Sequence, residues 1–149
     1  MKKITLFLAL FTAAFCVSAA APSGWMTDLT KAQAAALKQK KPLFILVTGS
    51  TWCPPCKALE RNVISQKSFQ EVVKNGAIGV FLDIPRSGMT PALRNSIKKL
   101  TFFRGGVPAF AVTDPDLKII KVPASRSIPA FNAAVKTGIE KMKKYKAAK

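Results

Sequence analysis

The sequence contains no histidine, only three cysteines, and seven acidic residues against 24 lysines and arginines. A Cys-x-x-Cys haem attachment site requires a histidine directly after its second cysteine, and Lys57 occupies that position after Cys56. A structural zinc site requires four cysteine, histidine or carboxylate ligands, usually arranged as two pairs. A chain without histidine whose cysteines are Cys16, Cys53 and Cys56 fits neither metal site, and we expect no metal or other cofactor.

The sequence also lacks an apolar run long enough to cross a bilayer. An apolar stretch over residues 4–17 follows Lys2 and Lys3 and precedes small residues, which is typical of a secretory signal peptide. We predict a signal peptide over residues 1–20, cleaved after Ala20, and a periplasmic or secreted protein with no membrane span after cleavage. The alternative, a lipoprotein anchored through Cys16, is disfavoured because bulky Phe15 stands where such signals carry a small residue.

Composition indicates one domain, which we place at residues 21–149. A chain of 149 residues with 49% apolar residues can build a core without disulfide support. We expect this domain to be a monomer.

The net charge of +17 predicts attraction to an acidic protein or an anionic surface. The lysines are spread along the chain without interleaved aromatic residues, so we expect no specific nucleic-acid site.

Hydrophobic patterning predicts an α/β chain in which helices and strands alternate. The expected helices cover residues 29–40, 56–74 with a break at 65–68, 91–100 and 129–146, and the expected strands cover residues 43–48, 77–83, 108–113 and 118–122. Strands joined by helical crossovers pair in parallel, whereas a hairpin pairs antiparallel. We therefore predict a mixed central sheet with helices on both faces and a C-terminal β-hairpin plus helix. The last helix should face the core through Phe131, Val135, Ile139, Met142 and Tyr145.

Cys53 and Cys56 follow the strand at residues 43–48 and stand at the beginning of a helix. A purely structural disulfide between them would close a very short loop, which stabilises least in the chain-entropy model. At a helix amino terminus, unpaired N–H groups and the helix dipole stabilise a thiolate. We therefore predict a redox pair in which Cys53 is the exposed attacking thiolate and Cys56 is the shielded resolving thiol.

The residues around the two sulfurs should tune their chemistry. Pro54 and Pro55 have no N–H to donate, so the Cys56 amide is the best donor to the Cys53 sulfur. Each proline also fixes φ, which favours ring closure in entropy and moves the protein toward a more reducing potential. Lys57 either adds positive charge near the sulfurs or points to solvent.

Two motifs resemble the thioredoxin family. Residues 52–57, WCPPCK, match its Trp-Cys-x-x-Cys-Lys active site, and GGVPAF at residues 105–110 matches the Gly-Ile/Val-Pro segment before its hairpin. The resemblance covers roughly residues 31–146 and is strongest to exported bacterial thioredoxin-like proteins. It implies a thioredoxin-like fold, a cis Pro108 facing the disulfide, a Val107 backbone offered to substrate, and Trp52 flanking the site. Plain packing remains the alternative for Trp52 and Val107.

The sequence departs from the family pattern at two positions. Thioredoxin has a buried aspartate six residues before its first cysteine, and Val47 occupies that position here. Glu60 lies one helical turn after Cys56, and we hypothesise that it replaces the missing proton acceptor through water. The alternative is a surface acid paired with Lys57 or Arg61. Ala109 stands where thioredoxin usually has threonine, so substrate contacts there should differ.

These features predict an exported thiol-disulfide oxidoreductase that reduces or exchanges protein disulfides through Cys53 and Cys56. Its partners would be protein thiols or disulfides and an upstream thiol reductant. One alternative is a disulfide oxidase or isomerase of the Dsb type, although the chain lacks the histidine and the helical insertion that strong oxidases of that class carry. An alternative of another class is a basic module that binds anions or membrane surfaces and carries a non-catalytic disulfide.

Overall fold

The computed structural model describes residues 20–120 and 128–147. The predicted signal peptide up to residue 19, with Cys16, lies outside this part of the chain, as do the last residues of the predicted hairpin, 121–122. The elements are α1 (Leu29–Gln39), β1 (Leu43–Thr48), α2 (Pro54–Leu59), the π-helical turn η1 (Glu60–Ile64), α3 (Lys67–Gly76), β2 (Ile78–Asp83), α4 (Pro91–Lys98), β3 (Ala109–Thr113), β4 (Ile119–Ile120) and α5 (Ile128–Ala147). Their order confirms the predicted alternation, including the break between η1 and α3.

Two of the helices begin at a side-chain cap. Asp28 accepts a hydrogen bond from the Lys31 amide at 3.0 Å and begins α1. Thr90 accepts one from the Leu93 amide at 3.2 Å, and Pro91 takes the first position of α4. Each cap satisfies a backbone donor that has no partner within the helix.

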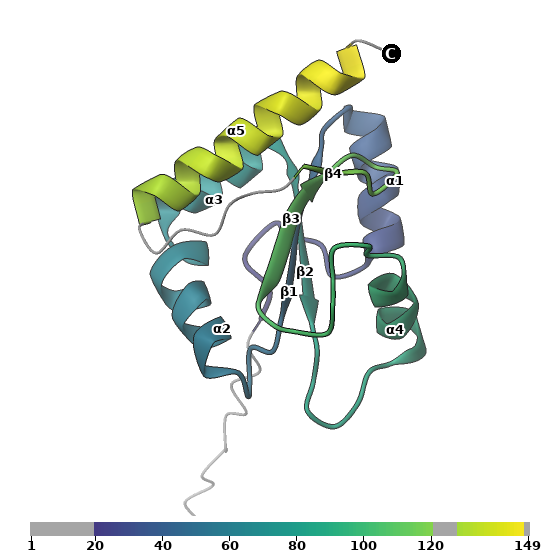
Figure 1. Cartoon of the computed structure of the whole chain (residues 1–149), viewed down its shortest axis with the longest axis vertical. Helices are drawn as coiled ribbons and strands as arrows, with labels where there is room; N and C mark the ends of the chain where they lie inside the picture. The colour runs from purple at the N-terminus through teal and green to yellow at the C-terminus, as the bar shows by residue number, and fades with distance from the viewer. Residues whose placement is uncertain (1–19, 121–127, 148–149) are drawn as a thin grey trace, which may run out of the picture.

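The sheet has the order β2-β1-β3-β4, with β1 at its centre in Figure 1. β1 pairs in parallel with β2 and antiparallel with β3, and β3 forms a hairpin with β4. Every residue of β1 is buried because helices cover both faces of the strand. The predicted mixed sheet is confirmed.

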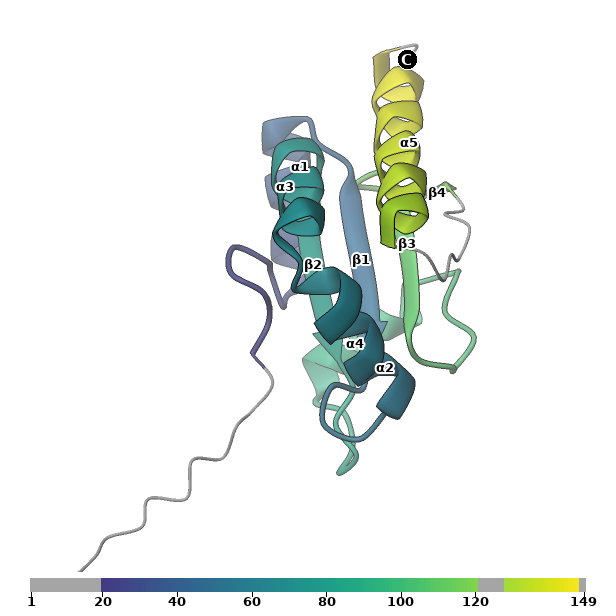
Figure 2. The same ribbon diagram turned by 90° about the vertical axis from the view of Figure 1, so that its left-hand side faces the viewer.

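Alternate side chains of β1 enter two different cores, as the pleat of a strand requires. Phe44 and Leu46 face α3 and α5, whereas Leu43, Ile45 and Val47 face α1 and α4. In Figure 1 the two layers lie to either side of the sheet, and in Figure 2 α2 and α3 lie in front of it.

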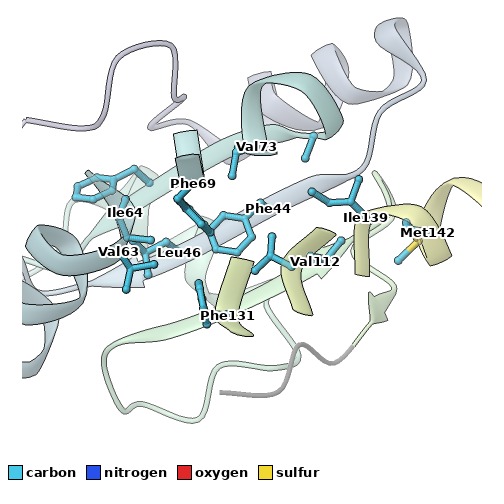
Figure 3. Packing of buried hydrophobic residues seen from close by; sticks show 13 residues of the cluster. Phe44, Leu46, Val63, Ile64, Phe69, Val73, Val112, Phe131, Ile139 and Met142 are labelled. Atoms are coloured by element: carbon cyan, nitrogen blue, oxygen red, sulfur yellow. The ribbon is translucent and has the colours of Figure 1, made fainter. Parts of the chain in front are cut away.

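The core beneath α3 and α5 is built around aromatic rings, shown in Figure 3. Phe69 lies between Phe44 and Phe131, with ring centroids 5.4 and 5.7 Å away. Phe131 also makes an edge-to-face contact with Phe110 at 4.8 Å. The predicted stripe of α5 is buried at Phe131, Val135, Ile139 and Met142, which fixes the last helix on the sheet. The side chain of Tyr145 lies outside the described part of the chain.

The parallel arrangement brings three loops to one end of the sheet. β1 and β2 both finish there, at Thr48 and Asp83, and the antiparallel β3 begins there at Ala109. The start of α2, the loop from β2 to α4 and the loop into β3 accordingly lie at the lower end of the molecule in Figures 1 and 2. Carboxyl ends of parallel strands are where α/β folds place their functional sites.

Candidate active site

Cys53 and Cys56 form a disulfide at the amino end of α2, with their Cα atoms 5.2 Å apart. Cys53 is the N-cap residue, and its sulfur accepts a hydrogen bond from the Cys56 amide at 3.3 Å. This confirms the predicted donor, because Pro54 and Pro55 provide none. Cys53 keeps 4% of its surface exposed and Cys56 none. Cys53 is the more accessible sulfur, although it is less exposed than the sequence suggested because the loop before β3 lies against it.

The loop that presents Cys53 is attached to the ends of β1 and β2. The amides of Trp52 and Cys53 both donate to the Gly49 carbonyl, at 3.1 and 2.8 Å. Ser50 donates to the Asp83 carboxylate through its amide at 2.8 Å and through its hydroxyl. The sequence reasoning missed Ser50 and Asp83. The signal available was that polar residues stand at the carboxyl ends of two neighbouring parallel strands.

Trp52 is held between Gly49 and the loop after β2. Its indole N–H donates to the Ile84 carbonyl at 2.6 Å. A Cβ atom on Gly49 would lie 2.6 Å from Trp52 Cε2, closer than atoms tolerate, so only glycine allows the ring to take this position. The Trp52 ring is therefore packed against Gly49 and the loop after β2, and its backbone immediately precedes Cys53.

The loop before β3 places a backbone acceptor beside the disulfide. The Val107–Pro108 peptide bond is cis. Cys53 Sγ lies 3.7 Å from the Val107 carbonyl oxygen. A disulfide sulfur carries no proton, so this contact is packing in the oxidised protein, whereas a reduced Cys53 thiol could donate a hydrogen bond to the same oxygen.

Glu60 points back toward the end of β1. The hydroxyl of Thr48, which is fully buried, donates a hydrogen bond to Glu60 Oε1. The Glu60 amide also donates to the Cys56 carbonyl, one turn earlier. In the described part of the chain, no ion pair joins Glu60 to Lys57 or Arg61. An ion pair is observed between Lys143 and Glu140 instead. Val47 is buried in the opposite core, away from this carboxyl group.

The surroundings of Glu60 change its affinity for a proton. Burial raises the pKa of Glu60 above the ordinary glutamate value, and the Asp83 charge acts in the same direction. The Thr48 hydrogen bond and the Lys57 charge oppose this rise without cancelling it. Glu60 also lines a cavity of about 760 Å³, together with Trp25, Ile64 and Gln70. The cavity gives the carboxyl group a route to solvent on the side away from the disulfide.

A Cys-x-x-Cys disulfide at the start of a helix, following the central strand and facing a Val-Pro loop, defines a thiol-disulfide oxidoreductase of thioredoxin-like fold. Residues 24–115 match the family model described as thioredoxin-like, and the chain belongs to that family. The comparison with curated protein sequences gives no match.

The comparison with solved structures gives matches at low sequence identity. One is described as "DsbH Oxidoreductase", with a TM-score of 0.66 and 17% identity over 83% of this chain and 92% of that one. Another is a thiol:disulfide interchange protein of the thioredoxin family from Chlorobium tepidum TLS, with a TM-score of 0.41 and 17% identity over 82% of this chain and 99% of that one. Within residues 20–120 and 128–147, no helix has the length and apolar character needed to cross a membrane.

Proposed function

We propose that this oxidoreductase is exported and reduces or exchanges disulfides of proteins outside the cytosol. The observation that carries the proposal is the position of Cys53 Sγ. It accepts a hydrogen bond from the Cys56 amide at 3.3 Å, and it lies 3.7 Å from the Val107 carbonyl oxygen. The first contact favours a thiolate at Cys53, and the second lies where a substrate chain would approach. Export is inferred from the sequence pattern of residues 1–20.

The reaction begins with both cysteines reduced. The Cys53 thiolate attacks one sulfur of a substrate disulfide, which forms a mixed disulfide and releases the other substrate sulfur as a thiolate. Cys56 then loses its proton and attacks Cys53 Sγ, which closes the Cys53–Cys56 disulfide and releases the second substrate thiolate. Two electrons pass to the substrate. An upstream thiol reductant supplies two electrons to reopen the disulfide.

Substrate binding is assigned to the residues beside Cys53. Val107 would pair its backbone with an extended substrate segment, Pro108 would shape the loop that presents it, and Trp52 would bound the other side. Main-chain hydrogen bonds to an extended peptide give affinity without demanding a particular side chain. Such a site accepts many proteins, and any selectivity has to come from surrounding residues.

Glu60 is assigned as the group that accepts the proton of Cys56. The carboxyl group belongs to the turn after Cys56, bonds to buried Thr48, and lines a cavity open to solvent. A pKa raised by burial brings this carboxylate closer to the working pH, where a general base is most effective. The proton would pass from Cys56 through water to Glu60 and leave through the cavity.

Pro54, Pro55 and Lys57 are assigned to tuning. The prolines withhold amides from Cys53, which leaves a single close amide donor, from Cys56. Lys57 is exposed, and its charge acts on Glu60 by lowering the pKa of that carboxyl group. We therefore propose that Lys57 tunes the proton acceptor, Glu60, rather than Cys53.

Reduction of insulin disulfides in the presence of dithiothreitol tests the proposal. Wild type should accelerate the reaction and Cys53→Ser should not. Reduced Cys56→Ser, freed of dithiothreitol before insulin is added, should accumulate a mixed disulfide with its substrate. A basic module with an inert disulfide would accelerate nothing. The direction of the reaction is tested by the reduction potential, which we expect near the thioredoxin value of about −270 mV, since a value near about −120 mV would indicate a Dsb-type oxidase.

A further inference from the structure

The surface around the disulfide is formed by segments that carry no acidic residue. Residues 49–59 and 84–108 contain neither aspartate nor glutamate. They contain the basic residues Lys57, Arg86, Arg94, Lys98, Lys99 and Arg104. All six are exposed. Three of the six lie near an acid, since Lys57 acts on Glu60 and both Lys98 and Lys99 line the same hollow as Asp28. Arg86 and Arg104 are the cations in the loops next to the site.

Two of these cations stand in the loops that meet at the carboxyl end of β1. Arg86 lies in the loop that follows β2, three residues beyond Asp83, and Arg104 lies in the loop that leads to Val107. In Figures 1 and 2 the loop after β2 lies at the lower end of the sheet, where α2 begins, and the loop into β3 reaches that end where β3 begins. Cys53 is only 4% exposed and lies against Val107 of the second loop.

The nearest acids, Asp83 and Glu60, are partly buried, and their carboxyl groups are hydrogen-bonded to the protein. Both carboxylate oxygens of Asp83 accept hydrogen bonds from Ser50. Glu60 accepts from Thr48. The loop after β2 and the loop into β3 therefore each present an arginine, Arg86 and Arg104, to an approaching partner.

We infer that this basic surface selects protein substrates whose target disulfide is flanked by acidic side chains. The inference rests on the proposed function and adds to it the class of substrate. Complementary charge accelerates encounter and fixes orientation, and like charge disfavours it. Backbone pairing at Val107 would hold the substrate chain, while Arg86 and Arg104 would determine which chains are held.

The test uses three oxidised peptides with the same disulfide loop, flanked by glutamate, glutamine or lysine. The measured quantity is the second-order rate constant for oxidation of the reduced protein, followed by acid quench and mass spectrometry. We expect the glutamate peptide to react about tenfold faster than the glutamine peptide at low salt, and the lysine peptide to react slowest. In about 1 M salt, where the screening length is about 3 Å, the ratio should approach one.

Two charge-matched variants locate the effect. Arg86→Gln/Arg104→Gln should bring the ratio of glutamate to glutamine rates close to one. Lys38→Gln/Lys74→Gln removes the same charge at the opposite end of the sheet, where α1 and α3 finish, and should keep the ratio. If both variants lose the preference for the glutamate peptide equally, the total charge of the protein causes the preference rather than this surface. That result would overturn the inference.

Other outcomes distinguish a failure of this inference from a failure of the proposed function. Equal rates for all three peptides would refute the inference and leave the oxidoreductase intact, whereas no reaction with any peptide would refute the proposed function. Sedimentation with phosphatidylglycerol vesicles tests whether the same surface binds anionic lipid instead. If Arg86→Gln/Arg104→Gln weakens vesicle binding and leaves the peptide ratio unchanged, the surface binds lipid and the inference is wrong.

Discussion

The hydroxyl of Thr48 donates a hydrogen bond to the carboxyl group of Glu60, which joins the end of the central strand to the helix that carries both cysteines. Thr48 has no exposed surface, and Glu60 is only partly buried. The pair holds an ionisable group on the turn that follows Cys56. Three predictions follow from this one contact.

Glu60→Gln should slow the step in which Cys56 releases the substrate. Glutamine keeps a hydrogen-bonding oxygen for Thr48 but cannot accept a proton, so about a tenfold decrease is expected, at the low end of what acid–base catalysis contributes. The measurement is the decay of a preformed mixed disulfide between pH 5 and 9. Glu71→Gln, which removes an exposed acid from α3, is the matched control. An unchanged pH profile in Glu60→Gln would exclude Glu60 as the proton acceptor.

Thr48→Val should move the same pH profile to higher pH. The Thr48 hydrogen bond lowers the pKa of Glu60, so its removal leaves burial and the Asp83 charge less opposed and the pKa rises further. Valine has nearly the shape of threonine and fits the buried position. The rising part of the profile should therefore shift upward while the rate at high pH is retained. A downward shift would contradict the proposed role of the hydroxyl.

Glu60 should also make stability depend on pH. Its pKa is raised in the folded protein, so folding is most favourable below the ordinary glutamate pKa and loses stability as pH rises through the raised value. Glu60→Gln resembles the protonated form at every pH. In urea unfolding, wild type and Glu60→Gln should differ least near pH 4, and Glu60→Gln should be the more stable near pH 8. If the free energy of unfolding of wild type rises relative to that of Glu60→Gln as pH increases, the pKa of Glu60 is not raised in the folded protein.

The sequence predicted the fold because its signals are local. The length and β-branched residues of the continuous apolar run at 43–48 favour a strand covered on both faces, and Asp28 and Thr90 cap helices through their own neighbours. The cysteine pair was recognisable for the same reason, since the chemistry of Cys53 depends on its place at the amino end of the next helix.

The supporting contacts of the site could not be predicted in the same way. The bond between Ser50 and Asp83 joins residues 33 apart, and only the parallel register of β1 and β2 brings them together. The direction of the Glu60 side chain depended on whether Thr48 lies within reach, which the spacing along α2 does not determine. The register of β1 and β2 decides the first contact, and the packing of the helix after β1 on the sheet decides the second, so a single sequence leaves both open.

Pro55→Ala should raise the reduction potential by about 5–20 mV. The alanine restores an amide at the amino end of α2, and a donor at a helix terminus stabilises an anion by about 0.3–1 kcal/mol, where 30 mV corresponds to about 1.4 kcal/mol. It also loosens the loop and so reduces the preference for ring closure. Both effects favour the reduced form. Equilibration with glutathione measures the potential, and a lower value would contradict this account of the prolines.

Gly49→Ala should damage the site through Trp52. The added Cβ would lie 2.6 Å from Trp52 Cε2, so the ring must move, and its hydrogen bond to the Ile84 carbonyl must lengthen or break. Overpacking of this kind costs about 1–3 kcal/mol of stability. Because Trp52 immediately precedes Cys53 in the chain, we also expect slower insulin reduction, even at temperatures where the variant is fully folded.

Gly76→Ala separates the two effects. Its Cβ would lie 2.8 Å from Ile139 Cγ2, between α3 and α5, so it also overpacks the protein but does so at the end of the sheet away from the disulfide. Urea unfolding should show a loss of stability in both variants, because buried Ile139 is stiff at χ1 and cannot turn its Cγ2 methyl away freely. Insulin reduction by folded Gly76→Ala should equal that of wild type. If folded Gly49→Ala is equally active, Trp52 contributes packing alone, and its assignment to substrate binding fails.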